Sequence, residues 1–219
     1  MNNLGVLGLG SVSTVYYIEL LNRTFHLKHD GYSTCPFTMI NINFNDINPY
    51  LPNDFVNIKR HILPFLEYID SLKIKNLIIP NITIHESIDS ILLEENFKFN
   101  LIHPVNILIN YLIQEDIKEI ILLGTKYTMS GGYIKTKLLQ NGISIIKLDN
   151  KTISLVDSIR KDVYHGNIEK GKEQLNGISK KYPNRKIVLA CTELSVAAKE
   201  NLFYIDMVSL HVKKTIEII

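Results

Sequence analysis

The heptapeptide Val188-Leu189-Ala190-Cys191-Thr192-Glu193-Leu194 decides how this sequence is interpreted. It is a short apolar run, typical of a buried strand, that ends in a thiol, a hydroxyl and a carboxylic acid. Polar side chains at the carboxyl end of a buried strand, where a helix begins, are typical of ligand sites in open α/β sheets. The unpaired N–H groups of a helix start favour a thiolate, so the stretch predicts a lowered pKa for Cys191. The alternative interpretation is a small buried cysteine that ends a strand.

The composition indicates an ordinary globular chain. Its 219 residues, of which 46% are hydrophobic, suffice for one domain or two small ones. The 24 basic and 22 acidic residues are intermingled, so we expect neither a nucleic-acid partner nor a membrane surface. Without an apolar run of about 18 residues or a signal-peptide pattern, a cytoplasmic location is expected. The two cysteines, Cys35 and Cys191, are too few for a disulfide framework.

Short apolar runs alternate along the chain with longer segments of helical spacing. This alternation predicts an α/β fold with parallel sheets and crossover helices. Strands are predicted at residues 4–8, 38–44, 76–80, 119–123, 143–148 and 185–190. Helices are predicted at about 13–22, 56–72, 85–95, 105–114, 130–140, 151–164, 167–181 and 209–219. The first of these helices is expected to carry Val15, Ile18 and Leu21 on one face.

The second half of the chain weakly repeats the pattern of the first. Gly8 and Gly124 each end a strand, and Asn81 and Cys191 each follow a later one. The repeat predicts two α/β lobes of about 100 residues that divide near Pro104. If the carboxyl ends of their sheets face each other, the Asn81 and Cys191 loops lie on opposite sides of one cleft.

A glycine turn, Gly8-Leu9-Gly10-Ser11, follows the first predicted strand and lets the backbone enter a helix. The turn departs from the dinucleotide fingerprint G-x-G-x-x-G, because its third glycine is Ser13 here and no ribose-binding acid follows about 20 residues later. We therefore expect its amides to bind a small anion such as a carboxylate.

Four motifs together resemble, in their order, those of the cofactor-independent aspartate/glutamate racemases. The motifs are GLGSVST at 8–14, LLGTKYTM at 122–129, ACTEL at 190–194, and FYID at 203–206 followed by His211. The resemblance implies two Rossmann-like parallel-sheet lobes related by pseudo-twofold symmetry, with the active site in the cleft between them. It implies that residues 1–103, joined by a C-terminal helix at 208–219, form the first lobe and residues 104–207 the second. It also implies an isomerase that needs neither pyridoxal phosphate nor metal, acting on a small amino acid or carboxylic acid, and a homodimer.

The family sets one cysteine on each face of the substrate's α-carbon, so that one thiolate removes a proton and the opposite thiol returns one. Cys191 matches the second-lobe cysteine, whereas Asn81 stands in the place of the first, within the segment 80–85. An amide has no useful basicity near neutral pH and cannot take over that role. Cys35 precedes the strand at 38–44, so we expect it at the amino edge of the sheet as a structural residue.

The resemblance also assigns the remaining site residues. It implies that Thr83, Glu193 and His211 take part in catalysis, Glu193 and His211 by tuning Cys191 or accepting its proton. The residues it implies for substrate binding are Gly10, Ser11, Ile82, Thr83, Thr125, Thr128 and Thr192. Ordinary turn and N-cap chemistry is the alternative for the threonines. Aspartate-specific relatives have basic residues at two places that correspond here to 52–54 and 163–166, which contain neither Arg nor Lys.

Three functions remain open at this point. The first is an amino-acid racemase or epimerase with Cys191 on one face and a water, Thr83 or His85 on the other. The second is a single-cysteine decarboxylase or isomerase resembling the arylmalonate decarboxylases, in which Cys191 protonates a carbanion. The third is a non-catalytic protein that binds a small carboxylic acid. The resemblance favours the racemase.

Overall fold

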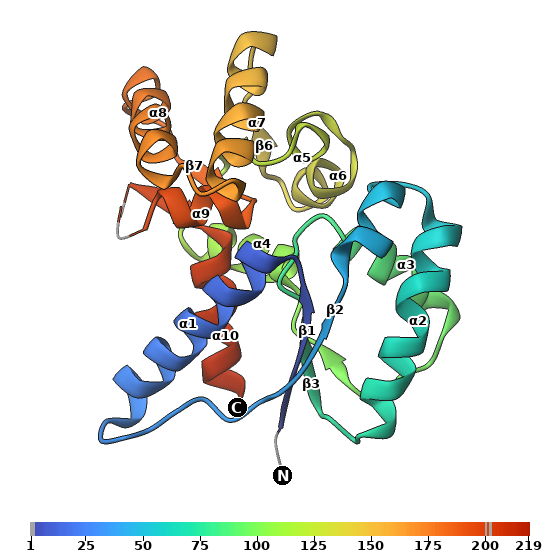
Figure 1. The fold of residues 1–219 in the computed structure, drawn as a ribbon. Coiled ribbons are helices and arrows are strands. Elements are labelled where there is room, and N and C mark those ends of the chain that lie inside the picture. Colours follow the sequence, from blue (N-terminus) through green and yellow to red (C-terminus); the bar gives the residue numbers. More distant parts are fainter. Residues whose placement is uncertain (1–2, 200, 202) are drawn as a thin grey trace. The chain divides into compact units, whose positions relative to one another are not determined.

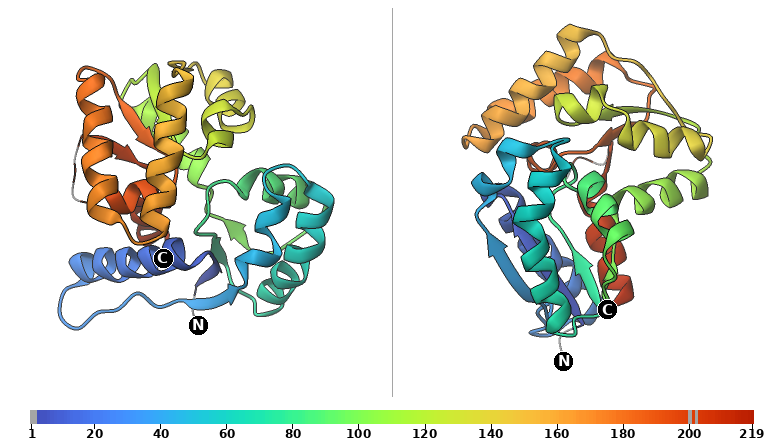
Figure 2. Two further views of the ribbon diagram at one scale, coloured as in Figure 1. Left: turned by 45° about the horizontal axis from the view of Figure 1, so that its top comes forward. Right: turned by 90° about the vertical axis from the view of Figure 1, so that its right-hand side faces the viewer.

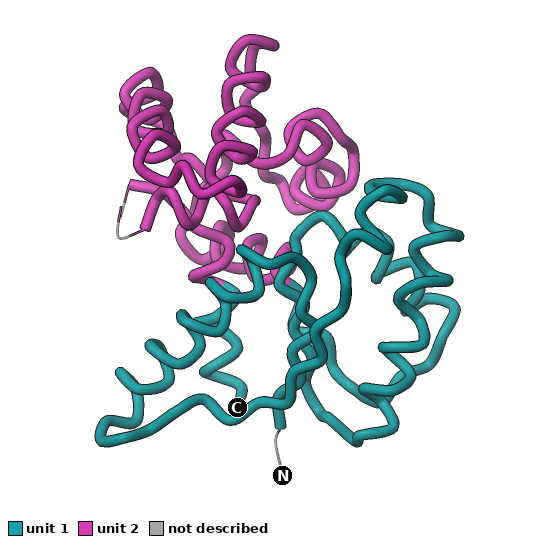
Figure 3. The backbone as a smooth tube through the Cα atoms, viewed as in Figure 1, with its two compact units in different colours: residues 1–103, 211–219 teal, residues 104–210 magenta. Residues whose placement is uncertain are grey.

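Each half of the chain builds a parallel β-sheet of four strands, as the alternation of apolar runs and helices predicts. The computed structural model describes residues 3–199, 201 and 203–219. By its internal contacts the chain divides into unit 1, residues 1–103 and 211–219, and unit 2, residues 104–210 (Figure 3). The prediction of an α/β fold with two parallel sheets is thus confirmed.

The sheet of unit 1 has the strand order β2-β1-β3-β4 (Figure 1). Its strands are β1 (Leu4–Leu9), β2 (Thr38–Ile42), β3 (Asn76–Ile78) and β4 (Asn100–Leu101). The central strand β1 pairs with β2 through Val6 and Met39, and with β3 through Val6 and Ile78. Every residue of β1 is buried, as the unbroken apolar run of a central parallel strand requires.

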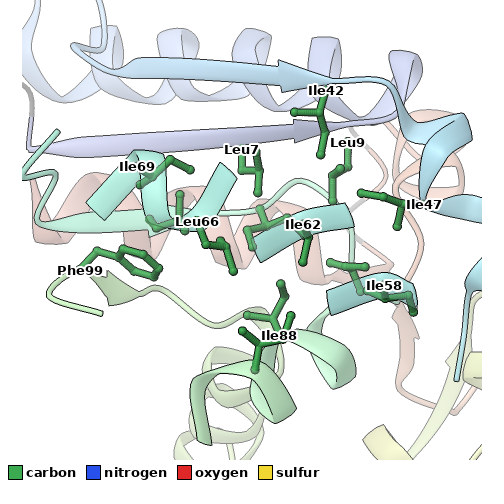
Figure 4. Close-up of a cluster of buried hydrophobic side chains, with 14 of the residues drawn as sticks. Leu7, Leu9, Ile42, Ile47, Ile58, Ile62, Leu66, Ile69, Ile88 and Phe99 are labelled. Carbon is green, nitrogen blue, oxygen red and sulfur yellow. The ribbon is translucent and has the colours of Figure 1, made fainter. Parts of the chain in front are cut away.

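Helices cover this sheet, and an apolar core lies beneath them. The helices of unit 1 are α1 (Ser11–His29), α2 (Phe55–Ser71), α3 (His85–Glu94) and the last part of α10 (Met207–Ile218), with short 3₁₀ turns at Phe44–Asp46 and Asn48–Tyr50. One face of α2 carries apolar side chains three and four residues apart, which pack against Leu7 and Leu9 of β1 (Figure 4). These are Ile58, Ile62, Leu66 and Ile69.

The sheet of unit 2 has the order β6-β5-β7-β8, the same arrangement in sequence order as in unit 1. Its strands are β5 (Glu119–Leu123), β6 (Ser144–Ile145), β7 (Ile187–Leu189) and β8 (Tyr204–Asp206). Its helices are α4 (Pro104–Gln114), α5 (Lys126–Ser130), α6 (Tyr133–Gln140), α7 (Asn150–Tyr164), α8 (Ile168–Lys181) and α9 (Thr192–Ala197). Helices α7 and α8 lie side by side and both contact α9 (Figure 2). The ends of β3 and β7, which precede Asn81 and Cys191, are thus equivalent in the two topologies.

The structure differs from the sequence-based elements in several places, among them α5, which begins at Lys126, before the helix predicted at 130–140. Helix α1 runs from Ser11 to His29, longer than predicted, and buries Tyr17, Leu20 and Leu21, whereas Val15 is 67% exposed. Of the predicted face, Leu21 is buried and Ile18 is half-buried, so the prediction was wrong for Val15 alone. The short strands β4 and β8 were not predicted, because the polar Asn100 and Asp206 interrupt the apolar residues there. Helix α10 begins at Met207, two residues before residue 209, where the helix was expected to begin.

Among the described residues, no helix combines the length and the apolar character that crossing a membrane would require.

Candidate active site

Cys191 lies between β7 and α9, and its extended backbone caps the helix. The carbonyl of Cys191 accepts hydrogen bonds from the backbone N–H groups of Leu194 and Ser195, both at 3.1 Å. Its thiol donates to Oε2 of Glu193 at 2.8 Å. The side chain is 6% exposed and packs in the apolar cluster that also contains Leu189 and Leu194. The structure thus pairs the only thiol of unit 2 with a carboxylate two residues later.

The predicted lowering of the Cys191 pKa is wrong. Burial raises the pKa of the thiol well above its usual value, and the charge and hydrogen bond of Glu193 raise it further. Helix α9 has six residues, so its N-terminus offers only a weak field. Arg160 and a hydrogen bond from the Glu193 backbone lower the pKa, but not enough to reverse these effects. In the free protein Cys191 is therefore a neutral thiol at neutral pH, and Glu193 is the nearest acceptor for its proton.

Thr125 and Thr128 lie at the end of the neighbouring strand β5. The Thr125 hydroxyl caps α5 by accepting the Thr128 backbone N–H at 3.1 Å, and the two hydroxyls are 3.0 Å apart. Between them and Cys191 the backbone is tightly packed, because a methyl group on Gly124 would come within 2.9 Å of Thr128 and 3.1 Å of the Ala190 carbonyl oxygen. The two strand ends thus bring the predicted hydroxyl groups of unit 2 next to the turn that carries Cys191.

Asn81 occupies the equivalent strand end in unit 1, and its side chain has a structural partner. Its Oδ1 accepts the backbone N–H of Ile84 at 3.1 Å, and its carbonyl accepts Nδ1–H of His85 at 2.7 Å. Ile82 is buried and Thr83 is half-buried. The amide therefore holds the turn that precedes α3, as asparagine side chains commonly do in turns.

The glycine turn of unit 1 follows β1, next to the strand that leads to Asn81. Gly10 has φ of 87°, a conformation that favours glycine, and it caps the long helix α1. Ser11 begins that helix and is exposed, whereas Ser13 donates its hydroxyl hydrogen to the Leu9 carbonyl at 2.6 Å. The first backbone N–H groups of α1, which follow Gly10 and Ser11, therefore lie at the carboxyl end of the sheet.

His211 is fully buried in unit 1 and both of its ring nitrogens have partners. Its Nε2–H donates to the Ile102 carbonyl at 2.7 Å, so the unprotonated Nδ1 accepts from the Tyr17 hydroxyl at 3.0 Å. Burial lowers the pKa of His211 to about 4. Within unit 1, His211 is therefore a neutral imidazole at neutral pH.

His85 is equally buried and therefore unsuited to the second face of a substrate. Because Nδ1–H donates to Asn81, Nε2 carries a lone pair, and within the described residues it has no hydrogen-bond partner. Burial lowers the pKa of His85 well below its usual value, and the neighbouring His103, with its ring centroid 4.8 Å away, adds to this. Across residues 3–199, 201 and 203–219, no three His, Cys, Asp or Glu side chains are grouped to hold a metal ion.

The charged residues Asp157, Arg160 and Asp206 were not identified from the sequence as neighbours of the segment that contains Cys191. Arg160 on α7 donates twice to Asp157 and interacts electrostatically with Cys191 and Glu193. Ser195 donates to the Asp206 carboxylate at 2.5 Å, which fixes α9 to β8. The spacing of three between Asp157 and Arg160 is typical of a helical ion pair and signalled a fixed cation, although it did not indicate its target.

Cys35 lies just before β2, buried, with its backbone N–H donating to Oδ1 of Asn22 at 3.2 Å. Burial raises the pKa of its thiol to about 11. This cysteine is at the amino end of the sheet, away from the strand ends that carry Gly10 and Asn81.

Three solved structures show what this arrangement resembles. An aspartate racemase homologue from Pyrococcus horikoshii OT3 is 20% identical, with a TM-score of 0.81 over 100% of this chain and 99% of that one. A putative Asp/Glu racemase from Yersinia pestis is 20% identical, with a TM-score of 0.83 and the same coverage. The aspartate racemase of Picrophilus torridus is 21% identical, with a TM-score of 0.78 over 98% of this chain and 94% of that one.

No protein-family model matches the sequence, and a search of curated proteins finds no match. The similarity is therefore one of structure, and it extends over both units. This chain has the fold of the aspartate and glutamate racemases.

Proposed function

We propose that this chain is a cofactor-independent amino-acid racemase or epimerase in which the sulfur of Cys191 handles the α-proton. The observation that carries the proposal is the Cys191–Glu193 pair, a thiol 2.8 Å from a carboxylate at the carboxyl end of a central strand. The fold shared with aspartate and glutamate racemases supports the same reaction class. A small amino acid is the proposed substrate, and a homodimer the proposed assembly.

The thiol must first lose its proton, because its raised pKa keeps it neutral. Glu193 accepts that proton: the S–H bond breaks, its electron pair stays on sulfur, and a carboxylic acid forms. The thiolate then removes the α-proton of the substrate, which regenerates the thiol and leaves a carbanion. Water protonates the opposite face, and the resulting hydroxide takes the proton from Glu193. Each proton is accounted for, and the α-carbon is inverted.

The side chains near Cys191 would bind the substrate's α-carboxylate. Thr192 follows the thiol, and Thr125 and Thr128 lie at the adjoining strand end. We propose that these hydroxyls donate to the carboxylate. For unit 1 we propose, as separate substrate contacts, the amides after Gly10 and Ser11 and the side chains of Ile82 and Thr83. Hydrogen bonds that strengthen as charge develops on the carboxylate would stabilise the carbanion.

A one-base decarboxylase is a second candidate, favoured by the same neutral thiol. Asn81 provides no second acid or base, and its Oδ1 already accepts a backbone N–H. If a malonate-type acid loses CO₂, the electron pair left behind forms a carbanion that the Cys191 thiol can protonate on one face. The thiolate then regains a proton from solvent. This reaction uses a thiol as a donor, which is the state that burial of Cys191 favours.

Deuterium exchange distinguishes the two candidates. The full chain is incubated in D₂O with a panel of L- and D-amino acids, and α-deuterium is followed by NMR together with chiral analysis. A racemase produces deuterated product of inverted configuration. Exchange with retention indicates a one-base enzyme, and CO₂ release from a malonate-type acid without exchange indicates the decarboxylase. Absence of both reactions would contradict the proposed function.

Asn81→Cys should increase racemase-type exchange about tenfold with one enantiomer, because it restores a thiol on the face that Asn81 leaves without a base. The same change removes the acceptor for the Ile84 N–H, at a cost of about 1 kcal/mol in stability. The measurement is the rate of deuterium incorporation from each enantiomer.

Asn81→Ser is the matched control, since a hydroxyl can cap the turn but adds no thiol. Equal rates in the two variants, with Cys191 still open to alkylation, would mean that the substrate does not lie between the two positions. That result would favour the decarboxylase.

A further inference from the structure

Helix α7, which carries the positively charged Arg160, packs near the turn that contains Cys191. It packs against α9, and its apolar residues Ile159 and Val163 belong to the same buried cluster as Cys191. Arg160 is the next residue on α7 after Ile159, so its backbone lies at the edge of this cluster. Its electrostatic interactions reach both Cys191 and Glu193.

The guanidinium is held in place by a buried acid. Nε and Nη2 of Arg160 donate to Oδ1 of Asp157 at 3.2 and 2.8 Å, and Nζ of Lys161 lies 2.8 Å from Oδ2. The Arg160 side chain is 26% exposed, whereas that of Lys161 is 60% exposed. The Asp157 carboxylate therefore pairs with both Arg160 and Lys161. Of the two, the less exposed Arg160 is the one that lowers the pKa of the Cys191 thiol.

The charges around Cys191 oppose one another. Burial and Glu193 raise the pKa of the thiol, and Arg160 lowers it. From the other elements packed nearby, β8 contributes Asp206, whose carboxylate is occupied by Ser195. Strands β5 and β7 and helix α8 contribute apolar side chains to this cluster. Among the residues that the structure describes, Arg160 is the cation whose charge acts on Cys191 against that of Glu193.

We propose that Arg160 is a positioning residue of the Cys191 site: its guanidinium, fixed by Asp157, stabilises the Cys191 thiolate beside the Glu193 carboxylate. The inference rests on the proposed function, because that reaction needs a thiolate. When Cys191 ionises, its proton passes to Glu193, and the pair changes from a thiol beside a carboxylate to a thiolate beside a carboxylic acid. The pair carries one negative charge in both states, first on the Glu193 carboxylate and then on the Cys191 sulfur. The positive charge of Arg160 attracts it in either place.

The test is the pH profile of Cys191 alkylation, which requires no turnover. Iodoacetamide reacts with the thiolate: a C–S bond forms, the C–I bond breaks and iodide leaves. The full chain carrying Cys35→Ser is labelled between pH 6 and 11, and the rate is followed by mass spectrometry. Arg160→Gln should move the profile to higher pH, so that labelling below its midpoint slows roughly threefold to tenfold.

Three further variants separate charge from structure. Arg160→Lys keeps the charge and should retain most of the wild-type rate. Lys161→Gln removes a positive charge that binds the same aspartate from the exposed side, and it should leave the profile unchanged. Glu193→Gln should move the profile to lower pH, opposite to Arg160→Gln. Circular dichroism confirms that each variant is folded.

The proposal is overturned if Arg160→Gln gives the wild-type profile, or if Arg160→Lys slows labelling as much as Arg160→Gln does. Should Arg160→Gln not fold, Arg160→His takes its place, because an imidazole can still donate to Asp157 but is uncharged above about pH 8. A shifted profile in a protein that exchanges no amino acid would contradict the proposed function and leave this inference standing. An unshifted profile in a protein that racemises an amino acid would contradict this inference and leave the proposed function standing.

Discussion

Cys191→Ser should lower α-proton exchange by at least about 10³-fold with every substrate that the wild-type chain accepts. A serine hydroxyl keeps nearly the shape of the thiol and can still donate to Glu193, but it is a far weaker acid and forms almost no anion in water. A positioned general base contributes about 10² to 10⁴ in rate, and here the same sulfur also regenerates the acid. The measurement is deuterium incorporation at the α-carbon, followed by NMR.

Cys35→Ser is the control for a thiol that is buried and distant from the strand ends. It removes the other thiol of the chain, and the exchange rate should stay within about twofold of wild type, because Cys35 lies before β2, at the amino end of the sheet. Full activity in Cys191→Ser, or a loss of activity in Cys35→Ser with the fold intact, would show that the site was assigned to the wrong cysteine.

Acidification from pH 7 to pH 5 should cost unit 1 about 2 kcal/mol of unfolding free energy through His211 alone. Its pKa is about 4 in the folded chain, against an ordinary value of about 6.5 in the unfolded chain. Between these values the unfolded chain binds more protons, so stability is complete above pH 6.5 and falls as the pH drops toward 4. The lowered pKa of His85 acts in the same direction.

His211→Gln isolates this effect, since an amide can donate to the Ile102 carbonyl and accept from Tyr17 without titrating. The variant should lose less stability between pH 7 and pH 5 than wild type, by about 2 kcal/mol, in urea unfolding followed by circular dichroism. The comparison also removes the contribution of Asp206, whose raised pKa acts with the opposite sign in both proteins. Equal losses in the two proteins would mean that His211 has the same pKa in the folded and in the unfolded chain.

The fold was predictable because its pattern is local. The apolar runs of β1, β5 and β7 and the helical spacing of α2 are each visible within a few residues, and their alternation leaves little choice but parallel sheets. Strands β4 and β8 could not be found in the same way, since the polar Asn100 and Asp206 interrupt their apolar residues. Their place in the sheets is set by pairing with distant residues.

The site was predictable only where its residues are neighbours in the sequence. Cys191, Thr192 and Glu193 form one turn, and the motif states their proximity directly. The ionisation of Cys191 was mispredicted because it depends on burial and on Arg160, 31 residues earlier, and neither can be read from the heptapeptide. For His211 the motif gave the residue, but not the two hydrogen bonds that keep it neutral.

The central claim is that Cys191 performs the chemistry, and parallel alkylation and activity measurements test it most directly. Wild-type protein is treated with iodoacetamide above pH 8, where more of the thiol is ionised, and samples are divided between peptide mass spectrometry and the exchange assay. We predict that exchange activity falls in proportion to carbamidomethylation of Cys191, and that a substrate amino acid slows both. Full exchange activity with Cys191 completely alkylated, or a loss that follows labelling of Cys35 instead, would contradict the account.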